Sequence, residues 1–172
     1  EKSVLQVFGK KYVLPVHQGR AAENIISKTF ITEGSVIPMN YHFTTTRAHI
    51  ELNGGKIFEL FEPEAMKINS SHPFKGNIDP VQLEKVIIDS GPKNVPFIRM
   101  EASTNLIGGQ PFSLGNFKAV RKIADKYNLI IVLDASLIGE NAYFILKREP
   151  GFENQSLESI LLQMCDLADI VY

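Results

Sequence analysis

Residues 113–128, SLGNFKAVRKIADKYN, and residues 129–135, LIIVLDA, together indicate the fold class. In the first segment, apolar residues recur at the spacing of one helix face. They are Phe117, Val120, Ile123 and Ala124. The second segment is an unbroken apolar run that ends in an acid, Asp134. A strand without polar alternation is typical of a parallel sheet buried between two layers of helices.

The same succession of short apolar runs and amphipathic segments recurs along the whole chain. Strands are predicted at 11–16, 35–39, 56–60 and 95–102, with a further strand beginning in the last four residues, DIVY. Helices are predicted at 1–8, from 19, from 44, at 79–91 and from 156. The sequence therefore predicts an α/β domain with a mostly parallel sheet and helices on both faces.

Composition narrows the class of protein. The chain has 172 residues, 44% of them hydrophobic, with 18 Lys and Arg against 19 Asp and Glu. This balance gives no electrostatic reason to expect nucleic acid as a partner, and no apolar run is long enough for a membrane span. The lone Cys165 excludes an internal disulfide and suits a reducing compartment. The missing initiator Met and an end inside a strand make us expect a piece of a longer protein.

Ligands of open α/β sheets bind at the carboxyl ends of the strands. Gln18, Gly19 and Arg20 follow the predicted strand 11–16 and open a helix. The free N–H groups of a helix start favour an anion, Gly19 permits close approach, and Arg20 adds a charged donor. An ordinary turn with a solvated arginine explains the three residues equally well.

Three more residues follow predicted strands. Asp134 either caps the next helix or pairs with a metal or a protonated ring nitrogen, Phe43 either packs or stacks on a planar ligand, and Asn105 marks a turn. The four histidines are scattered without ligand spacing, so we expect no metal site formed by these residues. An anion site, a stacking ring and an acid together describe pyridoxal 5'-phosphate.

Several longer motifs resemble one family. They are PVHQGRAAEN (15–24), FTTTRAH (43–49), FKGNID (74–79), NLIGGQPFSLGNFKAVR (105–121) and ENAYFI (140–145). In this order they resemble the β-eliminating lyases, the family of tyrosine phenol-lyase and tryptophanase. The resemblance implies the large domain of the aspartate-aminotransferase type (fold type I), with pyridoxal 5'-phosphate as cofactor, activation by potassium, and a cytoplasmic homotetramer.

The resemblance also implies roles for individual residues. Gln18, Gly19 and Arg20 match the family's phosphate-binding stretch, and Phe43 matches the residue that stacks on the cofactor ring. Asn105 matches the partner of the cofactor's 3'-oxygen, and Asp134 matches the acid at the ring nitrogen. Thr44 matches the catalytic threonine that holds the phenol oxygen in the tyrosine enzyme, where tryptophanase has Asp.

The sequence departs from the family pattern at two places. Leu137 stands where the family has an arginine that supports the 3'-oxygen, and leucine can donate no hydrogen bond there. The family's Schiff-base Lys and small domain match no part of residues 1–172, which we therefore interpret as a partial cofactor-binding large domain. On that basis we expect the 172-residue chain alone to be inactive.

The resemblance implies that the parent protein is a carbon–carbon lyase. It would cleave an aromatic amino acid, in the manner of tyrosine phenol-lyase, to pyruvate, ammonia and the aromatic leaving group. Two alternatives stay open, the first because of Leu137 and the second because the family's Schiff-base Lys is not matched. One is a divergent member that acts on another β-substituted amino acid, such as a cysteine desulfhydrase or a tryptophanase, and the other is a non-catalytic fragment or split subunit.

Overall fold

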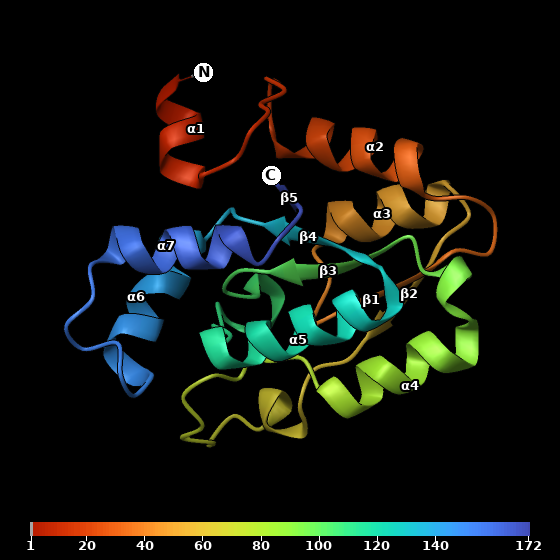
Figure 1. Cartoon of the computed structure of the whole chain (residues 1–172). Coiled ribbons are helices and arrows are strands. Elements are labelled where there is room, and N and C mark those ends of the chain that lie inside the picture. The colour runs from red at the N-terminus through yellow and green to blue at the C-terminus, as the bar shows by residue number, and fades with distance from the viewer. Residues whose placement is uncertain (1) are drawn as a thin grey trace.

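The structure is a computed structural model that describes residues 2–172, and its centre is a single five-stranded sheet (Figure 1). The strands are β1 (Val36–Met39), β2 (Lys56–Glu59), β3 (Phe97–Glu101), β4 (Ile130–Asp134) and β5 (Ile170–Val171). Their order in the sheet is β2-β1-β3-β4-β5, and every pairing is parallel. The parallel sheet predicted from the apolar runs is confirmed.

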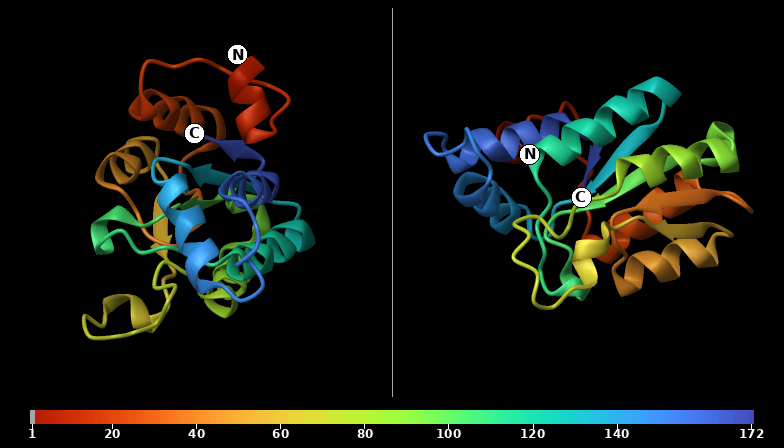
Figure 2. Two further views of the ribbon diagram at one scale, coloured as in Figure 1. Left: turned by 90° about the vertical axis from the view of Figure 1, so that its left-hand side faces the viewer. Right: turned by 90° about the horizontal axis from the view of Figure 1, so that it is seen from below.

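Helices cover both faces of this sheet (Figure 2). They are α1 (Lys2–Phe8), α2 (Gly19–Phe30), α3 (Thr44–Leu52), α4 (Pro80–Ser90), α5 (Leu114–Tyr127), α6 (Ile138–Arg148) and α7 (Leu157–Asp166), with 3-10 turns η1 (Pro63–Met66), η2 (Pro92–Asn94) and η3 (Asn105–Ile107). The larger apolar cluster packs the sheet against α4, α5, α6 and α7, and a smaller one packs it against α2 and α3. No helix within residues 2–172 is both long and apolar enough to cross a bilayer.

The helix ends follow from local chemistry in the sequence. The Asp79 carboxylate caps α4 by accepting from the Val81 and Gln82 N–H groups at 2.9 and 3.1 Å, and Pro80 occupies the first helical position. Ser113 caps α5 by accepting from the Asn116 N–H at 3.0 Å. Asn128 ends α5 in the left-handed conformation with φ of 55°.

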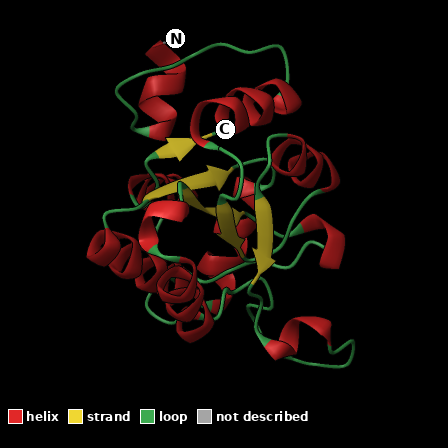
Figure 3. Ribbon diagram, turned by 90° about the vertical axis from the view of Figure 1, so that its right-hand side faces the viewer, coloured by secondary structure: helices red, strands yellow, loops and turns green. Residues whose placement is uncertain are grey.

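The strand predicted at 11–16 is wrong. Residues 9–18 connect α1 to α2 without joining the sheet, and Tyr12 and Leu14 are 80% and 70% exposed. Pro15 has no N–H for a strand ladder, and no strand among the described residues pairs with this segment, so its apolar residues gain no sheet burial. In Figure 3 the segment is a loop that passes outside the sheet.

The register of β3 and β4 places three charged residues on one face of the sheet. Arg99 lies opposite Val132, and Glu101 lies opposite Asp134. Side chains alternate between faces along a strand, and Val132 packs in the smaller cluster with α2 and α3. Arg99, Glu101 and Asp134 therefore share the α2 and α3 face, at its carboxyl end.

The strand order reverses between β1 and β3, which is where open α/β sheets bind ligands. These two strands share one register pair, Met39 with Arg99, and then diverge. The Asn40 side chain fills the gap, because it accepts from the Glu101 N–H at 2.9 Å and donates to the Glu101 carbonyl at 3.0 Å. A buried amide thus continues the ladder where the backbones separate.

Candidate cofactor site

A cavity of about 400 Å³ opens at the carboxyl ends of β3 and β4. This volume lies within the range of roughly 300–1,000 Å³ typical of small-molecule sites. Its lining comprises Gln18, Gly19, Arg20, Glu23, Phe43, Thr45, Glu101, Ala102, Asn105, Asp134, Ser136, Leu137 and Tyr172. All six residues expected to bind the cofactor therefore lie around one cavity.

The start of α2 forms one wall of the cavity. No hydrogen bond among residues 2–172 uses the N–H groups of Gly19 and Arg20, since the first backbone bonds of the helix run from Ala21 and Ala22 to the Gln18 carbonyl. A Cβ atom built on Gly19 would meet no described atom within 4 Å. The packing of the fold therefore does not require glycine at this position, and its missing side chain leaves the helix start open to close approach.

Phe43 and the threonines after it lie where the chain enters α3. Phe43 is the N-cap residue of α3 and is half-buried at the cavity wall. Thr45 lines the cavity, Thr46 is buried, and Thr44 is exposed and outside the lining. The structure therefore brings Phe43 to the cavity but leaves Thr44 beside it, and the catalytic role of Thr44 stays a prediction.

Asn105 lies on a rigidly held turn above the cavity. Its N–H donates to Glu101 Oε1 at 3.0 Å, and its side chain is exposed. Ser103, two residues earlier, has φ of 53°, which a non-glycine residue rarely adopts. The buried Asn141 side chain supports this geometry, because its Oδ1 accepts from the N–H groups of Ser103 and Phe112 at 3.0 and 3.1 Å.

Asp134 is buried at the base of the cavity with partners on both oxygens. Oδ1 accepts from the N–H and the hydroxyl of Ser136 at 3.0 and 2.7 Å. Oδ2 accepts from Arg99 Nη2 at 2.6 Å. The residue thus holds the turn before α6 without capping that helix, whose N-cap is Leu137, and it lines the cavity, so its pairing with a ring nitrogen stays a prediction.

Arg99 lies behind Asp134, and its side chain is 1% exposed. Its other donors reach the Tyr172 hydroxyl at 3.0 Å, the Tyr41 carbonyl at 3.2 Å and Glu101 Oε2 at 3.0 Å. Burial by itself lowers the pKa of Arg99, but the adjoining Tyr172, Asp134 and Glu101 hold it above its ordinary value. The guanidinium therefore stays charged.

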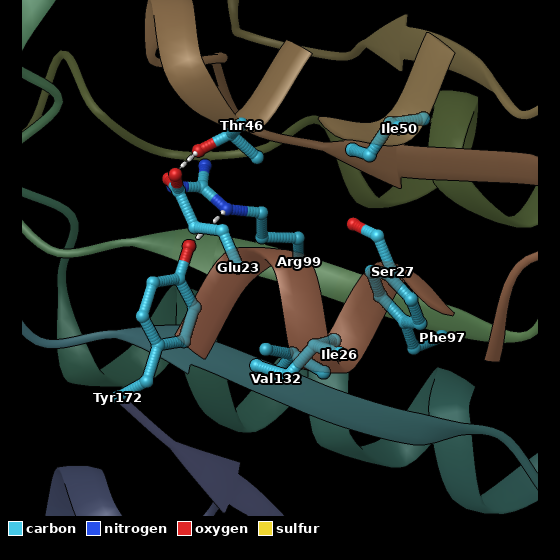
Figure 4. A pocket seen from close by; sticks show the side chains of 9 residues that line it. All are labelled: Glu23, Ile26, Ser27, Thr46, Ile50, Phe97, Arg99, Val132 and Tyr172. Carbon is cyan, nitrogen blue, oxygen red and sulfur yellow. Dashed lines mark hydrogen bonds between the residues drawn. The ribbon is translucent and has the colours of Figure 1, made fainter. Parts of the chain in front are cut away.

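The neighbouring side chains carry further acidic and phenolic groups (Figure 4). Glu23 Oε1 accepts from the Thr46 hydroxyl at 2.5 Å, whereas its buried Oε2 has no partner among the described residues. Burial raises the pKa of Glu101, with Arg99 acting in the opposite direction. Burial likewise raises the pKa of Tyr172, so its hydroxyl is neutral and accepts from Arg99 Nε.

Sequence reasoning missed Arg99, Glu101, Glu23 and Tyr172. A detectable signal existed for the first two, because Arg99 and Glu101 are two residues apart in an otherwise apolar strand and must share a face. Burial of such charges requires partners. Glu23 is one helical turn after Gly19, but only the packing of α2 against α3 brings it to the cavity.

The chain is similar in sequence to one family of known proteins. The model of the family described as beta-eliminating lyase matches residues 1–172. The tyrosine phenol-lyase of Symbiobacterium thermophilum is 42% identical over 169 residues, and that of Nostoc punctiforme is 41% identical. The matches cover 98% of this chain but only 37% and 36% of those relatives, so the chain spans little more than a third of their length.

Solved structures of low sequence identity share the fold. A complex of SepCysS with the N-terminal domain of SepCysE aligns with a TM-score of 0.60 at 18% identity, over 80% of this chain and 35% of that chain. Ornithine δ-aminotransferase of Plasmodium falciparum aligns with a TM-score of 0.57 at 19% identity, over 83% and 33%. The expected α/β architecture of the aspartate-aminotransferase type is confirmed, and by the sequence match the chain belongs to the β-eliminating lyase family.

Proposed function

We propose that the chain is the cofactor-binding part of a pyridoxal 5'-phosphate-dependent carbon–carbon lyase. The proposed reaction is that of tyrosine phenol-lyase, in which an aromatic amino acid gives pyruvate, ammonia and the aromatic leaving group. One observation carries the proposal. A helix start with free N–H groups, an aromatic ring and a buried carboxylate line the same cavity.

In this proposal each wall of the cavity holds one part of the cofactor. The N–H groups of Gly19 and Arg20, together with Gln18 and the Arg20 guanidinium, bind the phosphate. Phe43 lies against one face of the ring, and Asn105 donates to the 3'-oxygen. When bound, pyridoxal phosphate draws electrons away from the substrate's α-carbon. Asp134 keeps the proton on the ring nitrogen, on which that electron withdrawal depends.

Thr44 is the proposed catalytic residue of this chain. It adjoins Phe43 at the first turn of α3, where its exposed hydroxyl is free to hold the leaving-group oxygen of a substrate above the cavity. The tetrameric assembly, potassium activation and cytoplasmic location are further proposals that rest on the family resemblance. Residues 1–172, interpreted as a partial large domain, are proposed to act only as part of the whole protein.

One observation favours a second candidate function. Leu137 lines the cavity, so its wall is apolar where the family resemblance implies an arginine. A divergent lyase that releases another group, such as the thiol of cysteine or the indole of tryptophan, fits such a wall. This candidate differs from the first only in substrate.

An assay of the full-length protein with pyridoxal phosphate and tyrosine, tryptophan or cysteine separates these candidates. We expect pyruvate release from tyrosine to exceed release from the other two amino acids. Pyruvate from cysteine alone would make the aromatic-lyase proposal wrong and support the second candidate. Release from none of the three, with no binding of pyridoxal phosphate, would support the non-catalytic alternative.

Replacement of Gly19 by alanine tests the phosphate site directly. We expect pyridoxal phosphate affinity to fall about tenfold or more, because a methyl group would occupy the path of the anion to the helix start. Stability should hardly change, since nothing described lies within 4 Å of the new Cβ. Fluorescence titration with pyridoxal phosphate measures the affinity, and urea unfolding measures the stability.

The matched control is Gly139→Ala. Gly139 is also in the first turn of a helix, α6, its added Cβ also meets nothing within 4 Å, and it lies outside the cavity lining. It should leave the affinity unchanged. Equal affinity of Gly19→Ala and the unaltered protein would remove the α2 start from the phosphate site.

A further inference from the structure

The carboxylate of Asp134 has a limited number of positions left for a ligand. An ionised carboxylate offers about four acceptor positions, two on each oxygen. The N–H and hydroxyl of Ser136 use both positions on Oδ1, and Arg99 Nη2 uses one on Oδ2. The position that remains is on Oδ2, the same oxygen that Arg99 holds.

The Arg99 side chain is itself held by hydrogen bonds on all three of its nitrogens. Its three nitrogens donate to four acceptors, on Tyr172, Tyr41, Glu101 and Asp134. These four hydrogen bonds hold the planar guanidinium in one orientation. Glu101 is in turn held by the Asn105 N–H, so the turn above the cavity and the acid at its base are joined through one buried cation.

From these contacts we propose that Arg99 is the positioning residue of the cofactor site, which fixes Asp134 Oδ2 as the acceptor for the ring nitrogen. Glu101 and Tyr172 orient Arg99 from the two sides. Arg99 itself lies behind the cavity wall and does not line it. This inference rests on the proposed function, because it assigns a partner to the acid that would bind the cofactor.

Arg99 also offsets part of the negative charge of the buried carboxylates at the site. Glu23, Glu101 and Asp134 are all buried at the cavity, and Arg99 is the buried cation that contacts two of them. Leu137 adds no charge to the cavity wall, whereas Arg99 places a positive charge behind Asp134. The ring nitrogen would therefore meet Asp134 Oδ2, the carboxylate oxygen that already accepts from the Arg99 guanidinium.

Two variants of the full-length protein test this role. Arg99→Lys keeps the charge but cannot reach four acceptors, and Arg99→Met with Glu101→Gln removes the cation together with one carboxylate that would be left unpaired. We expect Arg99→Lys to lower pyridoxal phosphate affinity about tenfold and the double variant to lower it further. With cofactor labelled by ¹⁵N in the ring, the nitrogen resonance should move away from its position in the unaltered protein.

Arg121→Met is the matched control. Arg121 is a partly buried arginine that, like Arg99, donates to a carboxylate and a carbonyl: Asp169 Oδ2 at 2.7 Å and the Leu129 carbonyl at 3.0 Å, outside the cavity lining. The Arg121→Met variant should have a lower free energy of unfolding, with the pyridoxal phosphate affinity and the ring-nitrogen resonance unchanged. An unchanged resonance and affinity in both Arg99 variants would overturn the role of Arg99.

Binding of labelled pyridoxal phosphate to the unaltered protein distinguishes a failure of the Arg99 inference from a failure of the proposed function. If it binds labelled pyridoxal phosphate and only the Arg99 variants are indifferent, the inference alone is wrong. If it binds none, the proposed function fails first and the assignment of Arg99 fails with it.

Discussion

Asp134→Asn is expected to lower kcat/KM of the full-length protein about 100-fold or more, equivalent to about 2.7 kcal/mol or more of barrier height. An amide cannot supply the negative charge that keeps a proton on the ring nitrogen. Asparagine retains an oxygen that can accept from Ser136, so the turn toward α6 keeps most of its hydrogen bonds. Pyruvate release at several substrate concentrations gives kcat/KM, and urea unfolding reports any loss of stability.

The matched control for Asp134→Asn is Asp169→Asn. Asp169 Oδ2 also accepts from an arginine, Arg121 Nη1 at 2.7 Å, and from a backbone N–H, that of Ile131 at 2.7 Å, but it lies outside the cavity lining. Its replacement should cost similar stability with little change in kcat/KM. Equal losses of activity in the two variants would show that Asp134 matters only for folding.

Gly76→Ala is expected to destabilise the protein by about 3 kcal/mol, the upper end of the usual cost of overpacking. A Cβ on Gly76 would lie 2.2 Å from the Gln110 carbonyl oxygen and 2.8 Å from the carbonyl carbon of Pro111. Both are backbone atoms, so the clash cannot be relieved by rotation of a side chain, and overpacking of this kind commonly costs 1–3 kcal/mol. The midpoint of urea unfolding measures the change.

The cost of Gly76→Ala should extend to the cavity. Gly76 donates to the Pro111 carbonyl at 2.9 Å, and its own carbonyl accepts from Asn40, which holds Glu101. A shift at Gly76 therefore moves the turn that carries Asn105, and cofactor affinity should fall as well. Gly139→Ala is the control, expected to be neutral or slightly stabilising because alanine favours a helix. Wild-type stability of Gly76→Ala would show that the 104–111 turn adapts freely.

Elements with a strong local signal could be predicted from the sequence. The strand in the apolar run 129–135 and the capped helices that begin after Asp79 and Ser113 form as expected. An unbroken apolar run and a capping side chain can each be recognised within a few residues of the sequence. The segment 11–16 is also largely apolar, although it contains Pro15, and it forms no strand. A strand requires a partner in the sheet, and the identity of its neighbours is not a local property.

The same division applies to the candidate site. The sequence by itself determined that Asn105 and Asp134 lie at the ends of strands and that Gly19 and Arg20 open a helix, although the strand expected before Gln18 does not form. Phe43 was likewise expected near a strand end, and it precedes α3. Only the tertiary structure decided that they surround one cavity, that Thr45 lines it while Thr44 does not, and that Arg99 holds Asp134 from behind. The physical reason is that Arg99 and Asp134 are brought together by the register of two strands, which depends on how distant segments pack.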